Sequence, residues 1–387
     1  MNNKFFFPSK RSYIDSFKVM QLLSDANNLE NQGKTVYHLE LGEPPQFTPS
    51  LVKNELKKLI NSNLPGYTPS NGIRELRKKI SQFYEFKYKL NINYDNIFIT
   101  TGSSGAFLLS FIACFDKGQK VGIFNPVYPA YRNILKSLNI DVIEIFPEDS
   151  DIGKIDFRKV EKLKDLNGLI ISNPNNPNGQ VFSNKELDYV YNFCCENNIS
   201  LISDEIYHGI EFKKLSKSIL NFGPKAIVIN SFSKYFLMPG WRLGWTIIPD
   251  SLRENFLKLS QNLFISSGNI AQYSAVKIFN CIDELNEIVK KYSISRDKVH
   301  KLLSEVKGLN FRKPDGAFYF YLDVTKFNIN SENLAKKILN ETGIALTPGT
   351  DFDKKFGHRT LRLSFSIDNQ KVIKAVTKLK QWFAQNY

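Results

Sequence analysis

The alternation of short apolar runs with longer segments of helical spacing is the feature that most constrains how this chain can fold. The predicted strands include Ile97–Thr100, Lys120–Phe124, Val142–Ile145, Gly168–Ile171, Leu201–Ile202 and Ala226–Ile229. Several are continuous apolar runs, which is typical of parallel strands covered by helices on both faces. Helical spacing is found in the intervening and flanking segments, among them Ile14–Asn31, Ser50–Asn61 and Ile73–Tyr88. The pattern favours an α/β fold with a wound, mostly parallel sheet.

The pattern changes after about residue 285. A long helical segment is followed by a strand, a helix, a second strand and a final helix: Leu285–Gly308, Ala317–Leu322, Glu332–Thr342, Thr360–Phe365 and a helix from Asn369. This order predicts a smaller α+β unit that contains the C-terminus. No linker rich in glycine or serine separates the two parts, so we expect a long helix to cover the boundary.

The charge of the chain raises a question about its partners. Lys and Arg number 52 and Asp and Glu 38, which gives a formal charge of +14. Such a basic balance is compatible with binding to nucleic acid. The lysines are dispersed, however, and the sequence has neither a zinc-finger pattern nor an RNA motif with interleaved aromatic residues. We therefore expect no nucleic-acid partner.

Export, a membrane span and a metal centre are not indicated by the sequence. The N-terminal region lacks an apolar run of secretory length, and no window approaches the roughly 20 apolar residues that a spanning helix needs. The four cysteines have no C-x-x-C spacing, and the four histidines form no spaced ligand set. We expect a cytoplasmic protein with no membrane partner and no metal.

The clearest chemistry lies in the stretch from residue 231 to residue 244, which follows a predicted strand and reads S-F-S-K-Y-F-L-M-P-G-W-R-L-G. Ser231 and Ser233 flank Lys234, and Arg242 follows eight residues later. Hydroxyls and a guanidinium suit a phosphate dianion, and a lysine among them suits Schiff-base chemistry if its amine is unprotonated. An isolated lysine is usually a solvated surface residue, so it is the surrounding pattern that favours the functional interpretation.

This stretch resembles the cofactor-lysine site of the class I/II aminotransferases, fold-type I enzymes of the aspartate aminotransferase superfamily that depend on pyridoxal 5'-phosphate (PLP). Further family motifs occur in the family's order over about residues 14–384. The resemblance implies a large PLP-binding domain, residues 46–284, with a mostly parallel seven-stranded sheet wrapped by helices. It also implies a small α+β domain, residues 285–387, which the N-terminal segment, residues 1–45, would join.

By this resemblance, Lys234 forms the Schiff base with PLP. The phosphate is assigned to residues with hydroxyl or guanidinium groups: Ser103, Ser104, Ser231, Ser233 and Arg242. The first two lie in T-T-G-S-S-G-A, residues 100–106, where a strand ends and a helix opens, so amides and the helix dipole would favour an anion. Alone, that cluster would indicate only a capped turn. Tyr67 resembles the tyrosine that reaches the phosphate of a neighbouring subunit, which implies a homodimer with shared active sites.

Four residues are assigned to the ring of PLP. Tyr128, in N-P-V-Y-P-A-Y, matches the family's stacking aromatic residue, and Asn176, in N-P-N-N-P-N-G, matches the asparagine at the phenolic oxygen. Tyr207 would donate to the same oxygen. Asp204 would pair with the pyridine nitrogen and keep it protonated, and it closes a predicted strand, on the ligand side of an open α/β sheet. Taken alone, Asp204 would more often be a helix cap.

The substrate is assigned to Gly42, Asn176 and Arg362. Gly42 lies in L-G-E-P, the family's entry motif, whose glycine backbone lies near the substrate carboxylate. Arg362 lies in R-T-L-R-L-S-F, and alternation places it on the strand face opposite Leu361 and Leu363. A guanidinium there would grip the α-carboxylate with two hydrogen bonds. Arg359 is the second candidate, but it falls outside that alternation.

The implied activity is transfer of an α-amino group between an L-amino acid and a 2-oxo acid in a ping-pong cycle, with Lys234, Asp204 and Tyr207 as catalytic residues. The alternative is PLP-dependent β- or γ-elimination, as in C–S lyases or aminocyclopropane-carboxylate synthases. A cofactor-binding transcriptional regulator would need a DNA-binding region before the motif-bearing core. That core begins near residue 40, which leaves no room for one.

The sequence leaves the amino donor and acceptor open. Some relatives that use acidic substrates carry a lysine where this chain has Ser104, and no arginine occurs in Leu263–Gln272, a segment near the family's side-chain pocket. Both observations speak against a dedicated aspartate enzyme. The phenylalanine-rich N-terminus and Tyr13 could close over an apolar side chain, although an ordinary packed tail is the alternative.

Overall fold

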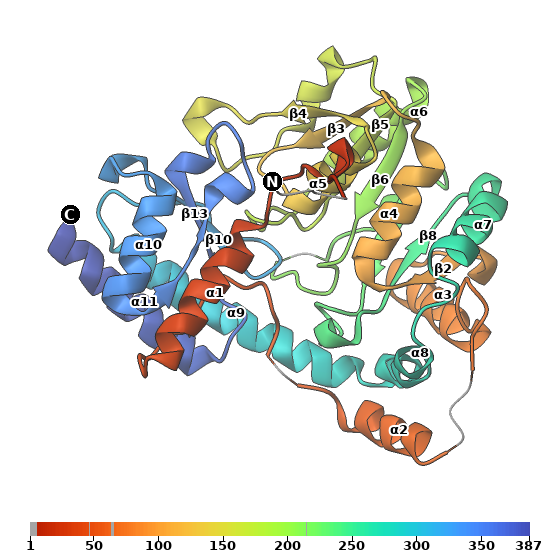
Figure 1. Cartoon of the computed structure of the whole chain (residues 1–387), viewed down its shortest axis with the longest axis horizontal. Helices are drawn as coiled ribbons and strands as arrows, with labels where there is room; N and C mark the ends of the chain where they lie inside the picture. Colours follow the sequence, from red (N-terminus) through yellow and green to blue (C-terminus); the bar gives the residue numbers. More distant parts are fainter. Residues whose placement is uncertain (1–5, 46, 63–65, 214) are drawn as a thin grey trace.

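The structure of the chain is a computed structural model that describes residues 6–45, 47–62, 66–213 and 215–387 (Figure 1). Its main element is a seven-stranded sheet with the order β2 (Ile97–Thr100), β8 (Gly244–Ile247), β7 (Ile227–Ser231), β6 (Ser200–Asp204), β5 (Gly168–Ser172), β3 (Lys120–Phe124) and β4 (Asp141–Ile145). The strands are parallel except β8, which is antiparallel to both of its neighbours. The predicted α/β fold with a mostly parallel seven-stranded sheet is confirmed.

The continuous apolar runs form strands because both faces of this sheet are covered. On β6, Leu201 packs into one core cluster and Ile202 into another; on β7, Val228 and Ile229 divide in the same way. Successive side chains of a strand point to opposite faces, so a strand buried on both faces has no polar alternation. The apolar runs therefore indicated parallel strands correctly.

Helices form the layers on the two faces of the sheet (Figure 1). One core cluster takes side chains from α4 (Gly102–Cys114), α5 (Pro129–Ser137) and α7 (Arg253–Leu263). The other takes side chains from α3 (Arg74–Tyr88), α6 (Asn184–Glu196), α8 (Asn269–Ala275) and the long α9 (Ile282–Ser304). The central strands β5, β6 and β7 end in polar residues at their carboxyl ends: Ser172, Asp204 and Ser231.

A smaller antiparallel sheet lies beside the large one, with the order β12 (Thr347–Pro348), β13 (Thr360–Ser364), β10 (Tyr319–Asp323) and β9 (Asn310–Phe311). Arg362 on β13 lies opposite Tyr321 on β10 and Thr347 on β12. The helices α10 (Ser331–Thr342) and α11 (Asn369–Asn386) belong to the same part of the chain. Near the N-terminus, β1 (Tyr37–His38) pairs in parallel with β11 (Ile344–Ala345).

The first long helix differs from its prediction. It was expected over Ile14–Asn31, but α1 begins at Lys18 and runs to Asn31. No side chain next to it in the sequence caps its start; instead the amides of Lys18 and Val19 donate to the Asp351 carboxylate, each at 3.3 Å. The cap is therefore tertiary, and local sequence signals could not locate the start of this helix.

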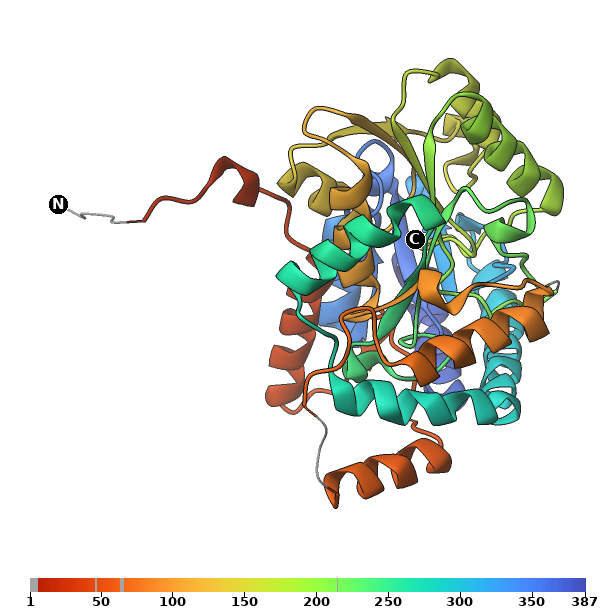
Figure 2. The ribbon, with the colours of Figure 1, turned by 90° about the vertical axis from the view of Figure 1, so that its right-hand side faces the viewer.

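Two segments lie at the edge of the molecule. Helix α2 (Ser50–Ile60) buries only Val52, and Figure 2 shows it beside the body of the chain. Figure 2 also shows residues 6–13 extending away from the body, where Phe6, Phe7 and Tyr13 are more than 70% exposed. Among the described residues, no helix has the length and apolar character that crossing a membrane would require.

Candidate active site

A cavity of about 290 Å³ lies between the carboxyl ends of the large sheet's strands and the small sheet. Residues from nine separate regions of the sequence line it. This is the usual position of a ligand site in an open α/β sheet. The structure brings most of the predicted site residues to its wall: Gly42, Ser103, Ser104, Tyr128, Asn176, Asp204, Tyr207, Ser233, Lys234, Arg242 and Arg362. Ser231 and Tyr67 are not in this lining.

Lys234 lies in the turn after β7, and its amine Nζ donates to the carbonyl oxygen of Gly42 at 2.7 Å. Burial, together with the nearby guanidinium groups of Arg362 and Arg242, lowers the pKa of Lys234 to about 8, although the charges of Glu43 and Asp204 oppose this shift. A substantial fraction of this amine is thus unprotonated near neutral pH. An unprotonated amine can attack a carbonyl carbon and accept a proton.

Hydroxyl and guanidinium groups gather at one end of the cavity, at the start of α4. Ser103 and Ser104 lie in the first turn of this helix, and Arg242 lies beside it with a left-handed backbone, φ 51°. A Cβ atom on Gly102 would lie 2.7 Å from the Nη2 atom of Arg242, so glycine is what allows the guanidinium to approach the helix end. The first-turn amides, the hydroxyls and the guanidinium together suit an anion with two charges.

Two residues assigned to a phosphate site do not line this cavity: Ser231, and Tyr67, which was expected to reach the phosphate of a neighbouring subunit. Ser231 is 1% exposed, and its hydroxyl oxygen lies within hydrogen-bond distance of the Ser233 hydroxyl, at 2.9 Å, and of the Leu243 carbonyl oxygen, at 3.2 Å. It therefore lies behind Ser233 and orients it, because a strand residue at that point faces the interior of the protein. Tyr67 is 87% exposed between α2 and α3, away from the cavity of its own chain.

Asp204 lies at the carboxyl end of β6 and is 2% exposed. Its carboxylate accepts a short hydrogen bond from the Tyr131 hydroxyl, and one from the Ile206 amide at 3.0 Å. Burial raises the pKa of Asp204 to about 7, although these hydrogen bonds and the charge of Lys234 favour the ionised form. A cationic group against this carboxylate would compensate the cost of burying it.

Three tyrosines line the middle of the cavity. Tyr128 precedes α5, and its ring lies 5.6 Å from the Tyr131 ring. The Tyr207 hydroxyl lies 2.7 Å from the Tyr319 hydroxyl, which comes from the small sheet. Burial raises the pKa of Tyr207 well above its usual value, so its phenol stays protonated and can donate a hydrogen bond. Tyr319 also packs closely against the backbone of Gly42, because a Cβ on Gly42 would lie 1.7 Å from the Tyr319 hydroxyl oxygen.

Arg362 lies on β13, on the side of the cavity opposite the α4 end. Its Nη1 donates to the Asn176 side-chain oxygen at 3.0 Å, and its Nη2 donates to the Glu40 carbonyl at 2.6 Å. The guanidinium carbon lies 4.4 Å from the Tyr319 ring centre and 4.6 Å from that of Phe352. Among the described residues, its buried Nε finds no hydrogen-bond partner. An unsatisfied donor on a buried cation indicates that an anionic ligand is missing here.

The second candidate arginine has a different position. Arg359 pairs with the exposed Asp149 carboxylate, and its guanidinium lies 4.9 Å from the Phe356 ring. It does not line the cavity. The alternation argument for Arg362 therefore selected the arginine that does.

Three residues at the site were missed by the sequence reasoning: Tyr319 and Phe17, which line the cavity, and Tyr131, which donates to Asp204 from outside the lining. Tyr131 follows Tyr128 by three residues and so lies near it at the start of a helix, a spacing that could have indicated it. Tyr319 shares the face of Arg362 only through the strand pairing, and Phe17 reaches the cavity from the far N-terminal segment. Neither position is marked by local sequence.

The Phe-rich N-terminus was expected to include the residues that close over the substrate or pack as a tail. Phe6, Phe7 and Tyr13 do neither in this chain, because all three are exposed, and Phe5 lies outside the described residues. Phe17, Val19 and Met20 line the cavity instead.

The cavity fits the cofactor that the sequence resemblance implies. One end offers first-turn amides, hydroxyls and Arg242 for a phosphate, and the centre offers a lysine amine of lowered pKa for an aldehyde. A buried carboxylate, Asp204, matches a protonated ring nitrogen, and its raised pKa shows that the chain alone does not compensate its charge. Among the described residues, no cluster of histidine, cysteine, aspartate and glutamate could hold a metal ion.

Comparison with known proteins gives one family. The model of the family "Aminotransferase class I and II" matches residues 34–379. The chain is 36% identical over 374 residues to (5-formylfuran-3-yl)methyl phosphate transaminase of Methanocaldococcus jannaschii, covering 95% of this chain and 97% of the relative. It is 33% identical over 384 residues to valine–pyruvate aminotransferase of Mycobacterium tuberculosis, covering 96% and 97%.

Solved structures show the same likeness. A crystal structure of an aminotransferase from Mycobacterium tuberculosis superposes with a TM-score of 0.95 at 32% identity, covering 98% of this chain and all of that one. The aspartate aminotransferase of Thermotoga maritima gives a TM-score of 0.91 at 28% identity, with 97% and 100% covered.

Proposed function

Because the chain belongs to the class I and II aminotransferases, which are PLP-dependent enzymes, we propose that its cavity moves an α-amino group between an L-amino acid and a 2-oxo acid with Lys234 as the proton carrier. The observation that carries the proposal is the environment of the Lys234 amine. It is held by the Gly42 carbonyl, and its pKa is lowered to about 8. The elimination alternative receives no support, since the relatives named above are aminotransferases.

When bound, PLP withdraws electrons from the Cα atom of an amino acid joined to it, which makes the Cα proton acidic. The chain's residues would hold it at both ends. Ser103, Ser104, Ser233 and Arg242 would bind its phosphate, with Ser231 orienting Ser233. Asp204, held by Tyr131, would keep the ring nitrogen protonated, and Tyr128 would pack on the ring.

The remaining residues would act on the amino acid. Arg362 would take the α-carboxylate, using the Nε donor that lacks a partner in the chain, while Asn176 fixes the direction of the guanidinium. Asn176 and Tyr207 would also face the phenolic oxygen of the cofactor. Lys234 would then remove the proton from Cα and deliver it to the C4′ carbon of the cofactor, because its amine lies in the cavity wall and has a lowered pKa. Gly42 would let the substrate carboxylate approach the backbone.

We further propose a homodimer in which Tyr67 of the partner subunit completes the phosphate site. The 87% exposure of Tyr67 and its absence from the lining of its own cavity support this arrangement. A large domain over residues 46–284 and a small one over residues 285–387 with the N-terminal segment 1–45 are proposed as well. A cytoplasmic location is supported by four cysteines that are all free thiols.

A single-turnover experiment tests the activity. The PLP-loaded protein is mixed with one L-amino acid and no 2-oxo acid, and its visible spectrum and products are followed. Transfer predicts pyridoxamine phosphate and one 2-oxo acid per site, after which a second 2-oxo acid restores the first spectrum. Continuous release of pyruvate and ammonia without a second substrate would instead show elimination. Lys234→Ala with full turnover would contradict the assigned role of the lysine.

A further inference from the structure

Residues 15–20, here called the entrance strap, form one wall of the active-site cavity. Phe17, Val19 and Met20 of this strap line the cavity, and the Phe17 ring lies 6.0 Å from the ring of Tyr128. Phe17 and Val19 are half-buried, whereas Met20 is 56% exposed. The strap therefore presents apolar side chains to the cavity from a segment far in sequence from the catalytic lysine.

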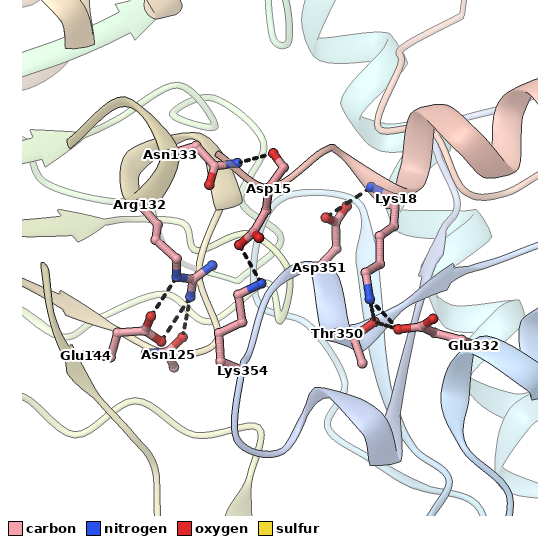
Figure 3. A network of polar contacts seen from close by, with 10 residues as sticks. All are labelled: Asp15, Lys18, Asn125, Arg132, Asn133, Glu144, Glu332, Thr350, Asp351 and Lys354. Atoms are coloured by element: carbon pink, nitrogen blue, oxygen red, sulfur yellow. Dashed lines mark hydrogen bonds and ion pairs between the residues drawn. The ribbon is translucent and has the colours of Figure 1, made fainter. Parts of the chain in front are cut away.

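Polar contacts hold the entrance strap from both sides (Figure 3). On the large-sheet side, the Asn133 side chain on α5 donates to the Asp15 carbonyl at 3.0 Å. On the small-sheet side, Lys354 pairs with the Asp15 carboxylate at 2.8 Å, and Asp351 accepts from two strap amides, as described for the start of α1. The Lys18 amine donates to Thr350 at 3.0 Å and pairs with Glu332. These contacts hold the strap across the cavity, so its apolar side chains have a defined position in the cavity wall.

The charges of the cavity are already assigned. Of the described residues that line it, three are cationic: Lys234, Arg242 and Arg362. Under the proposed function these take the proton, the phosphate and the α-carboxylate respectively. Among the described residues of this chain that line the cavity, no further cation is left for a second carboxylate on the substrate. Asp351, which lines the cavity beside the strap, offers only carboxyl oxygens there.

The position of the substrate side chain follows from these assignments. Arg362 would hold the α-carboxylate of the substrate and Lys234 would lie at its Cα atom. The substrate side chain therefore points to a part of the cavity wall that neither residue forms. Phe352 packs on the Arg362 guanidinium at 4.6 Å, and its neighbour Asp351 binds the strap amides. The strap thus borders the carboxylate end of the cavity, where the apolar lining residues include Phe17, Val19, Met20 and Phe352.

We propose that the amino donors of this enzyme carry an uncharged, apolar side chain, aliphatic or aromatic, and that Phe17 of the entrance strap is the residue that selects them. This inference rests on the proposed function. The physical reason is that apolar surface buried against Phe17 is stabilising, while a second carboxylate would lose its water without gaining a cation. The wall is apolar and lacks a counter-charge, so it favours amino acids with apolar side chains and also disfavours those with a second carboxylate.

The first test measures binding to the PLP-loaded protein without turnover. Isothermal titration calorimetry with unreactive carboxylates compares 3-phenylpropanoate and 4-methylpentanoate with succinate. We expect the two monocarboxylates to bind at least about tenfold more tightly than succinate, the size of effect that a few buried methylenes produce. Tighter binding of succinate would overturn the inference.

The second test changes the strap. Phe17→Ala should lower the preference for phenylalanine over alanine in single-turnover rates by about tenfold or more, because the lost ring contacts matter only to the larger side chain. Ile14→Ala is the matched control, since Ile14 lies just before the strap, is 45% exposed and does not line the cavity. It should leave the preference within about twofold. An equal fall for both amino acids in Phe17→Ala would contradict a selective role, and Phe17→Leu provides a milder variant if the alanine variant does not fold.

The two proposals can fail separately. Failure of every tested L-amino acid, apolar and acidic, to give pyridoxamine phosphate would remove the proposed function. Calorimetry with carboxylates would still decide whether the wall prefers apolar tails. Productive reaction with alanine together with preference for aspartate and glutamate over leucine and phenylalanine would keep the activity and overturn the substrate class.

Discussion

The hydroxyl of Tyr207 lies 2.7 Å from the hydroxyl of Tyr319. Tyr207 follows β6 of the large sheet, and Tyr319 begins β10 of the small sheet, so this hydrogen bond joins the two sheets inside the active-site cavity. The Tyr319 ring also supports the Arg362 guanidinium at 4.4 Å. One side chain thus contacts both the cofactor side and the carboxylate side of the site.

Tyr319→Leu should weaken binding of the substrate carboxylate by about 5- to 20-fold, because it removes the aromatic face under Arg362, a contact of about 1–2 kcal/mol. Tyr319→Phe keeps that face and should change binding by less than about threefold. The Kd of 4-methylpentanoate measured by calorimetry on the PLP-loaded protein distinguishes the two variants. Equal weakening in both would mean that the hydroxyl, not the ring, supports Arg362.

Gly42→Ala should damage the site through Tyr319. The added Cβ would lie 1.7 Å from the Tyr319 hydroxyl oxygen, so the ring must move or the backbone must shift. Overpacking of this kind costs about 1–3 kcal/mol of unfolding free energy, and we expect kcat/KM to fall by about 100-fold as Lys234 loses its Gly42 carbonyl partner. Denaturant unfolding and steady-state kinetics measure the two effects. Combining it with Tyr319→Phe should recover part of both losses, and no recovery would show that the damage does not pass through Tyr319.

The rate at which the cofactor-free protein captures PLP should depend on the Lys234 amine. Its pKa is lowered to about 8, so the unprotonated, reactive fraction rises tenfold per pH unit below that value and levels off above it. Absorbance-monitored reconstitution between pH 6 and 10 gives the profile. Lys234→Ala should abolish the covalent spectrum and lower turnover by about 1,000-fold or more. A profile that keeps rising to pH 10 would mean that this lysine is not desolvated.

Stability of the cofactor-free protein should fall as pH rises from about 4 to 7, through Asp204. The folded state raises the pKa of this carboxyl from 3.8 to about 7 by burial, so over this range the folded state binds more protons than the unfolded state. Asp204→Asn removes the ionisable group, and its melting temperature should decline less over the same range. A smaller decline should remain because burial also raises the pKa of Glu205 to about 8. Melting curves at pH 5, 6, 7 and 8 for both proteins provide the measurement, and parallel declines would exclude Asp204 as the source.

Arg362→Lys should raise the KM for amino acids by about 10- to 100-fold, because an ammonium cannot form the paired hydrogen bonds of a guanidinium or stack on Tyr319. Arg359→Lys is the control: its guanidinium pairs with the exposed Asp149 at the surface and should affect KM by less than about twofold. Initial rates over a range of amino-acid concentrations test both. A large effect of Arg359→Lys would indicate that Arg359, which directly precedes β13, binds the substrate carboxylate.

The large sheet and most residues of the cavity wall could be predicted from the sequence, because the sequence signals for them are local. Continuous apolar runs indicated parallel strands, and polar residues directly after them, such as Asp204 and Lys234, had to lie at one edge of the sheet. Strand β8 was not among the strands identified, since it is antiparallel and short and begins at a glycine. The start of α1 was misplaced because its cap, Asp351, comes from the other end of the chain.

What the sequence alone determined was the fold class, the candidate lysine and the types of group at the ends of the strands, since periodicity and short motifs report on each residue's own surroundings. The tertiary structure alone decided that Tyr131 holds Asp204, that Ser231 lies behind Ser233, that Tyr319 joins Tyr207 to Arg362, and that Phe17 rather than Tyr13 faces the cavity. These contacts join segments that are distant in the chain. They are set by how two sheets and an N-terminal strap pack together, and no local pattern encodes that packing.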